Sequence, residues 1–147
     1  MNTGPGPAGD PFGLQRFVDA QNPVYDQVRA ELRAGAKASH WMWFVFPQLA
    51  GLGRSATAKY FGIASRAQGA AYWRHPLLGA RLVECTGLVV AVQGRSAHDI
   101  FHSPDDLKFC SSMTLFEQVA PEEALFARAL DKYFGGRRDA RTLELLA

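Results

Sequence analysis

Apolar side chains recur along most of this chain at intervals of three and four residues, which is the spacing of one face of an α-helix. The pattern is clearest in the stretch 76–93, where Leu78, Leu82, Cys85 and Val89 share one face. It also covers the stretches 23–34, 103–116 and 121–134, and "TLELLA" predicts a short final helix. Turn dipeptides such as Asn-Gly, which join paired strands, do not occur in the sequence. The pattern therefore predicts an all-α protein.

The residues between these stretches are typical of helix ends. Five prolines stand where proline opens a helix, in "DPFG", "NPVY", "HPLL", "SPDD" and "APEE", because the first helical N–H has no partner to lose. Ser65 followed by Gln68 matches a capping box. Glycines occupy three expected helix C-termini: Gly35, Gly94 and Gly135. We predict a single multihelical globular domain of about seven to nine helices over residues 10–147, after a flexible leader, residues 1–9.

Composition narrows the class of protein. The chain has 147 residues, of which 48% are hydrophobic, enough for one domain with a substantial core. The net charge is only +2, and the one basic cluster is Arg137, Arg138 and Arg141. This balance argues against nucleic acid as a partner. The longest stretch poor in charge, "CTGLVVAVQG", is too short to cross a membrane, so we expect no membrane partner.

Cysteine usage points to a reducing compartment. Cys85 and Cys110 both fall inside apolar helical patterns, where buried free thiols are the simplest interpretation. No Cys or His spacing typical of zinc sites occurs, and neither the G-x-G-x-x-G nor the Walker sequence is found. We therefore expect a cytoplasmic protein that carries neither a metal nor a cofactor.

The stretch "SHWMWFVFPQ", residues 39–48, is unusually aromatic. Trp41 and Trp43 are two residues apart and would point to different sides of a helix. His40 and Gln48 flank the aromatic side chains, where a polar group needs a partner. Most of these side chains are expected in the core, and the simpler interpretation of His40 is a core histidine with satisfied hydrogen bonds. The alternative is that His40, Trp41, Trp43 and Gln48 line a ligand site.

The glycine-bearing loop "AGLGR" follows directly and ends at Arg54. A tight turn is the simpler interpretation. A loop before a helix N-terminus is also able to hold an anion on its backbone N–H groups. In that case the Arg54 guanidinium would meet the negative charge of the ligand.

The stretch 103–116, "SPDDLKFCSSMTLF", predicts a helix that is apolar on most sides and hence buried. Asp105, Lys108 and Ser112 share one of its faces. Asp105 is explained by its place in the first turn, where the helix dipole favours a carboxylate. Two interpretations of this face are open. The first is a structural ion pair between Asp105 and Lys108. The second is an active site, in which a desolvated Lys108 would be a candidate nucleophile or base.

The third stretch is "HPLLGARLVEC", in which Glu84 lies within the most apolar helix. Facing the interior, Glu84 would pair with Arg81 or Lys108 and would be a candidate general acid. Facing solvent, it would form an ordinary helical pair with Arg81.

These tracts, "HWMWFVFPQ", "HPLLGARLVEC" and "DDLKFCSSMTLF" with "KYFGG", resemble domain-of-unknown-function family 1810, a set of small bacterial proteins. The resemblance extends from about Asp10 to the end and implies a single multihelical domain, with no activity attached. Some members carry the label "calpastatin". The residues do not support that label, because calpain inhibitors are disordered whereas this chain is 12% aromatic and rich in helix caps.

Two functions remain open from the sequence. The first is a pocket for a small polar or nucleotide-like ligand with phosphate character, in which hydrolysis is a further option. Its candidate catalytic residues are Lys108, Asp105 and Glu84. Its candidate ligand-binding residues are His40, Trp41, Trp43, Gln48, Arg54 and Ser112. The second is a non-catalytic protein-interaction module that uses its aromatic face. The sequence identifies no protein partner.

Overall fold

The computed structural model describes residues 9–147, so all but the last residue of the expected leader lies outside it. This part of the chain contains ten α-helices, one 3-10 helix and no β-strand, which confirms the all-α prediction. The helices are α1 (Gln15–Gln21), α2 (Tyr25–Ala34), α3 (Met42–Val45), η1 (Ala50–Leu52), α4 (Ala56–Tyr60), α5 (Arg66–Arg74), α6 (Leu78–Ala91), α7 (Ala97–Phe101), α8 (Asp105–Val119), α9 (Ala124–Phe134) and α10 (Ala140–Leu146). The helices are slightly more numerous than expected, because α3, α4 and α7 are too short to show a period.

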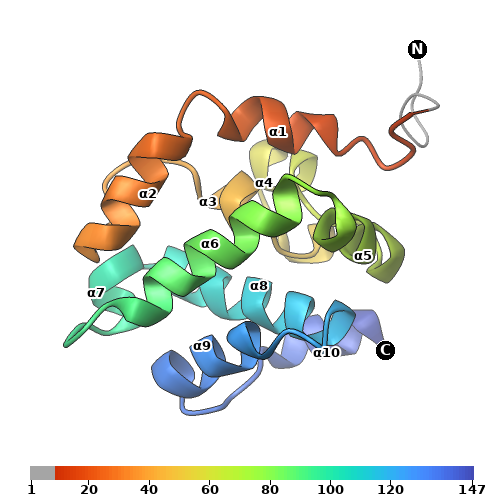
Figure 1. Ribbon diagram of the computed structural model, residues 1–147. Helices are drawn as coiled ribbons and strands as arrows, with labels where there is room; N and C mark the ends of the chain where they lie inside the picture. The colour runs from red at the N-terminus through yellow and green to blue at the C-terminus, as the bar shows by residue number, and fades with distance from the viewer. Residues whose placement is uncertain (1–8) are drawn as a thin grey trace.

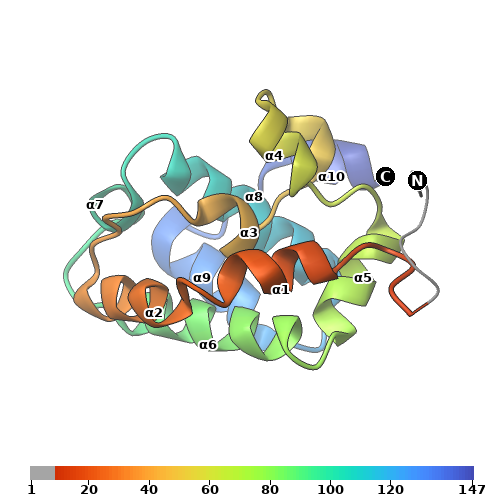
Figure 2. The ribbon, with the colours of Figure 1, turned by 90° about the horizontal axis from the view of Figure 1, so that it is seen from above.

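The longest helix, α8, runs through the middle of the molecule, and α6 crosses in front of it in the view of Figure 1 and along one edge in Figure 2. Helix α8 packs against α5, α7, α9 and α10, and α6 packs against α2, α5 and α9. Seen from above, α3 lies between α1 and α8 (Figure 2), and η1 packs against both α4 and α10. The aromatic stretch is thereby brought next to the start of α8.

Helix α8 is buried on most of its circumference, as its sequence predicts. Phe109, Met113 and Phe116 are fully buried. The Phe109 ring lies 4.7 Å from the ring of Phe101 and 5.0 Å from that of Phe46, measured between centroids. Such aromatic pairs add to the stability gained from apolar burial. These aromatic contacts hold α8, α7 and the segment after α3 together.

The polar side chains of α8 meet their hydrogen-bonding needs mostly within the helix. The Ser111 hydroxyl donates to the Leu107 carbonyl at 3.2 Å, and the Thr114 hydroxyl donates to the Cys110 carbonyl at 2.8 Å. Ser112 is the exception, because its hydroxyl is buried and has no partner among the described residues.

The helix ends only partly follow the predicted signals. The left-handed C-terminal glycines Gly35 and Gly135 are found. The box at Ser65 is half present, because the Ser65 hydroxyl accepts the Gln68 N–H, whereas the Gln68 side chain accepts the Ala64 N–H. The five prolines do not occupy first helical positions, because each lies in a turn one to four residues before its helix. Ser103 likewise makes no cap hydrogen bond, since the residue before α8 is Pro104.

Both cysteines are free, as predicted: Cys85 is buried and Cys110 is half-buried. Burial raises the pKa of the Cys85 thiol to about 11, against which a hydrogen bond to the Tyr25 hydroxyl acts only weakly. Among the described helices, none combines the length and apolar character that a membrane crossing requires.

Candidate functional site

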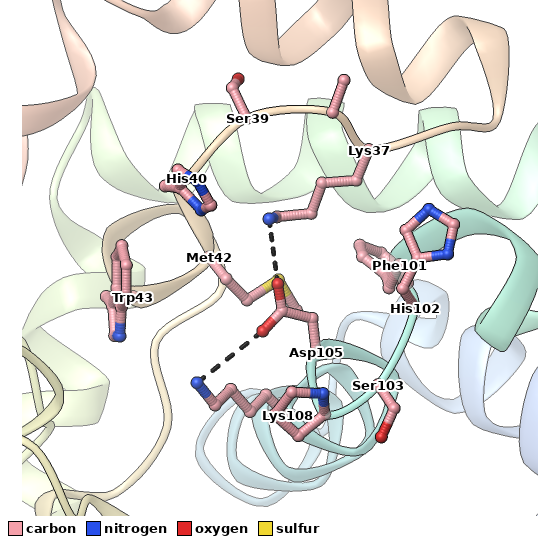
Figure 3. Close-up of a pocket in the computed structure, with 12 residues that line it drawn as sticks. Lys37, Ser39, His40, Met42, Trp43, Phe101, His102, Ser103, Asp105 and Lys108 are labelled. Atoms are coloured by element: carbon pink, nitrogen blue, oxygen red, sulfur yellow. Dashed lines mark ion pairs between the residues drawn. The ribbon is translucent and has the colours of Figure 1, made fainter.

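A cavity of about 400 Å³ opens where the segment before α3 faces the loop between α7 and α8 (Figure 3). We call it the lysine cavity. Its polar and aromatic lining includes Lys37, His40, Trp43, His102, Asp105 and Lys108. Its volume is in the range of small-molecule sites.

Asp105 lies between two ammonium groups in this cavity. Lys37 and Lys108 approach its carboxylate from opposite sides, with N–O distances of 2.9 Å and 3.7 Å (Figure 3). The Lys37 side chain is only 8% exposed and that of Asp105 20%, whereas Lys108 is 27% exposed. The closer and more buried pair is therefore Lys37–Asp105. Lys108 is held loosely and lies nearer to solvent.

Only one of the two neighbouring tryptophans faces the lysine cavity. Trp43 is half-buried, and the Lys108 amine lies 5.8 Å from its ring centroid, within cation–π range. Trp41 is 1% exposed, and its indole N–H donates to Glu31 at 2.9 Å. Trp41 is therefore a core residue, and the candidate for ring stacking is Trp43.

Glu31 fixes the backbone that carries Lys37 and Trp43. Its carboxylate accepts hydrogen bonds from the Ala38 and Ser39 backbone N–H groups, the Ser39 hydroxyl and the Trp41 indole. Burial by itself raises the pKa of Glu31. The hydrogen bonds, led by that from Ser39, outweigh burial and lower the pKa to about 2. The ionised carboxylate thus anchors one wall of the lysine cavity.

Two histidines lie at the rim of the cavity. His40 is exposed, so the expectation of a core histidine is wrong; the chain turns outward there before α3 begins. His102 has φ 62° and ψ 175°, a conformation that is nearly restricted to glycine. Backbone strain of this kind is concentrated at functional sites, and here it lies directly before α8.

A second cavity of about 440 Å³ lies on the other side of Lys108. We call it the arginine cavity. Gln48 and Arg54 line it from the segment around η1, Lys108 and Ser111 from α8, and Asp139 and Arg141 from the start of α10. A small gap lined by Trp43, Gln48 and Lys108 lies between the two cavities. The candidates Gln48 and Arg54 therefore belong to this second cavity.

Two sequence candidates lie elsewhere. Glu84 is exposed on α6, where its carboxylate accepts a hydrogen bond from the Tyr25 hydroxyl and lies 3.6 Å from Arg29. It pairs with neither Arg81 nor Lys108, so the predicted pairings of Glu84 are wrong. Ser112 is fully buried and lines neither cavity, because one turn beyond Lys108 the helix enters the core.

Three residues of the cavities were not predicted. Lys37 lies in "GAKASH", which has the composition of a solvated loop, and no local pattern indicates its pairing with Asp105. His102 carries no signal of its left-handed conformation. Arg141 was noted only as part of a basic cluster. Among residues 9–147, no group of three or more His, Cys, Asp or Glu side chains is arranged to hold a metal ion.

The sequence matches a family model described as a protein of unknown function, DUF1810, over residues 11–146. The fold is similar to the crystal structure of the conserved hypothetical protein Rv1873 from Mycobacterium tuberculosis. The two sequences are 59% identical, the alignment covers 93% of this chain and 98% of that one, and the TM-score is 0.92. No curated protein matches the chain.

Proposed function

This chain belongs to the family of proteins of unknown function DUF1810, and from the chemistry of its cavities we propose that it binds a small, negatively charged ligand with a planar, nucleotide-like ring. One observation carries the proposal: the exposed part of Trp43 and the amine of Lys108 lie together in a cavity of about 400 Å³. An aromatic face and a loosely held cation are the two groups that such a ligand needs.

The charge balance of the lysine cavity supports an anionic ligand. Lys37 and Lys108 face a single carboxylate, that of Asp105. Because Lys37 already neutralises Asp105 at 2.9 Å, the charge of Lys108 is available to a ligand. The neighbouring imidazoles of His40 and His102 supply further hydrogen-bond donors.

The arrangement supports binding more than hydrolysis. Asp105 is the carboxylate of the lysine cavity, and its oxygens face two ammonium groups. Such a carboxylate is better suited to hold the lysines than to take a proton from water. Glu84, the other candidate acid, lies on α6, which lines neither cavity, and its carboxylate lies 3.6 Å from Arg29.

The alternative function, a protein-interaction module, needs an exposed aromatic face. That face is small in the structure. Trp41 and Phe46 are each 1% exposed, which leaves Trp43 and Phe44 as half-buried members of that stretch.

We place the protein in the cytoplasm, where two free cysteines are stable.

The proposal is tested by a thermal-shift screen of nucleosides, nucleotides and sugar phosphates. We expect the melting temperature to rise with ligand concentration for at least one ring-bearing anion. In the variants Trp43→Leu and Lys108→Ala the rise should shrink or disappear. Arg128→Gln, on exposed α9 surface outside both cavities, is the control. No shift with any ring-bearing anion would refute the proposal.

A further inference from the structure

We propose that the arginine cavity is a phosphate subsite, so that the ligand is a phosphomonoester whose ring lies on Trp43 and whose phosphate lies among Arg54, Lys108 and Arg141. This inference rests on the proposed function. It adds the class of ligand, its orientation and a binding role for Arg141.

The two cavities are close enough to share one ligand. Lys108 and Pro104 line both of them. The gap between the cavities is lined by Trp43 on one side and Gln48 on the other, with Lys108 common to all three spaces. The gap itself has a volume of only about 10 Å³, so a ligand whose ring contacts Trp43 would reach the arginine cavity over Lys108 and Pro104, the residues common to both cavities.

Positive charge dominates the arginine cavity. Arg54, Lys108 and Arg141 line it together with one carboxylate, that of Asp139. One oxygen of this carboxylate, Oδ2, accepts hydrogen bonds from the Thr142 backbone N–H at 2.9 Å and the Thr142 hydroxyl at 2.6 Å, so Asp139 is held by the start of α10 while its single charge faces three cations. Three cations converge on a space in which the structure provides little compensating charge.

The two arginines are free to bind an anion. Within the described part of the chain, Arg54 takes part in no ion pair. Arg141 has only a distant partner, Glu144 at 3.7 Å, and both side chains are about two-thirds exposed. An exposed pair of this kind contributes little and is readily exchanged for a ligand. By contrast, Arg138 nearby is engaged by Glu117 and Asp131.

Two hydroxyls line the arginine cavity. The Ser55 hydroxyl accepts the Ala58 N–H at 3.1 Å and still has its own hydrogen to donate, whereas the Ser111 hydroxyl donates to the Leu107 carbonyl at 3.2 Å. The guanidinium groups and the Lys108 amine are the charged donors. Guanidinium forks bind the oxygens of a phosphate in pairs, and three cationic groups match a dianion better than a singly charged carboxylate.

Lys108 links the two parts of the ligand site. It can turn toward a phosphate without leaving Asp105 unpaired, because Lys37 remains 2.9 Å from that carboxylate. The Lys108→Ala substitution should therefore weaken binding of both the ring and the phosphate. Substitutions of Arg54 or Arg141 should weaken binding of the phosphate alone.

The test compares nucleosides with their 5′-monophosphates by calorimetric titration. Adenosine, guanosine and uridine are each paired with the corresponding monophosphate, and inorganic phosphate is the probe without a ring. The variants are Arg54→Gln, Arg141→Gln and the double variant, with Arg128→Gln as the matched change of charge outside both cavities. Melting temperatures check that the variants fold, which is expected because Arg54 and Arg141 are exposed.

We expect at least one monophosphate to bind more tightly than its nucleoside, and each arginine variant to weaken it about tenfold. Nucleoside affinity and the Arg128→Gln control should not change. If a monophosphate binds but the double variant leaves its affinity intact, the phosphate subsite is wrong and the proposed function stands. If neither nucleosides nor monophosphates bind, both are wrong.

Discussion

At the scale of single residues, Asp105 and Glu31 hold the site in place. Asp105 neutralises the nearly buried Lys37, and Glu31 ties down the backbone on either side of Ser39. The sequence placed Asp105 and Lys108 on one helix face and left open whether they form an ion pair, and in the structure the two groups lie 3.7 Å apart. It did not predict the shorter contact to Lys37, because residues 68 positions apart give no periodic signal.

Asp105→Asn should destabilise the protein by about 3 kcal/mol, because a nearly buried ammonium group would lose its partner. Lys108→Gln should change stability by less than about 1 kcal/mol, since its pair with Asp105 is longer and more exposed. Denaturant unfolding of both variants measures the two values. Equal losses in the two variants would show that Lys108, not Lys37, is the main partner of Asp105, and would contradict this prediction.

Ionisation of Glu31 makes the free energy of unfolding depend on pH. Its pKa is lowered from 4.5 to about 2 in the folded protein, so its contribution is fully present above pH 4.5 and is lost as the pH falls toward 2. A shift of this size corresponds to about 3 kcal/mol at neutral pH. Glu31→Gln should lower the free energy of unfolding by about that amount at pH 7 and approach the wild type near pH 2. A gap between the two proteins that stays constant from pH 7 to 2 would contradict this role.

At the scale of elements, the long helices were predictable and the short ones were not. The stretch 76–93 becomes α6, and 103–116 becomes most of α8, because several turns of apolar spacing define a face. Helix α3 has only four residues, so no period indicated that Trp41 would be buried while Trp43 reaches the lysine cavity. The cap signals identified helix ends correctly where a side chain closes the turn, as at Ser65.

Two glycines of α6 provide a matched test of how this helix is packed. A Cβ on Gly79 would lie 2.1 Å from the Trp73 carbonyl oxygen, whereas a Cβ on Gly87 would meet no atom within 4 Å. Gly79→Ala should cost more than about 2 kcal/mol, because α5 and α6 must move apart. Gly87→Ala should stabilise the protein by about 1 kcal/mol through helix propensity alone. Thermal or denaturant unfolding distinguishes the two. A Gly79→Ala variant as stable as wild type would contradict the close approach of α6 to the end of α5.

At the scale of the whole molecule, the cavities are built by three separated segments: residues 37–58, 101–111 and 139–141. The sequence pointed to the first two, through the aromatic stretch and the polar face of the helix at 103–116. The third depends on how the start of α10 packs against the middle of α8, where the Asp139 N–H donates to the Thr114 hydroxyl, and no local pattern encodes that contact. For the same reason Glu84 was grouped with Lys108, although α6 turns it toward α2.

The central claim is that a ring-bearing anion binds beside Lys108. Mapping of backbone amide chemical shifts during titration with the nucleoside monophosphates tests it most directly. We predict that the perturbed amides cluster at residues 37–43, 52–55, 101–111 and 139–141, while those around Arg29 and Glu84 stay unchanged. Perturbations confined to another face of the molecule, or none at saturating ligand, would contradict it.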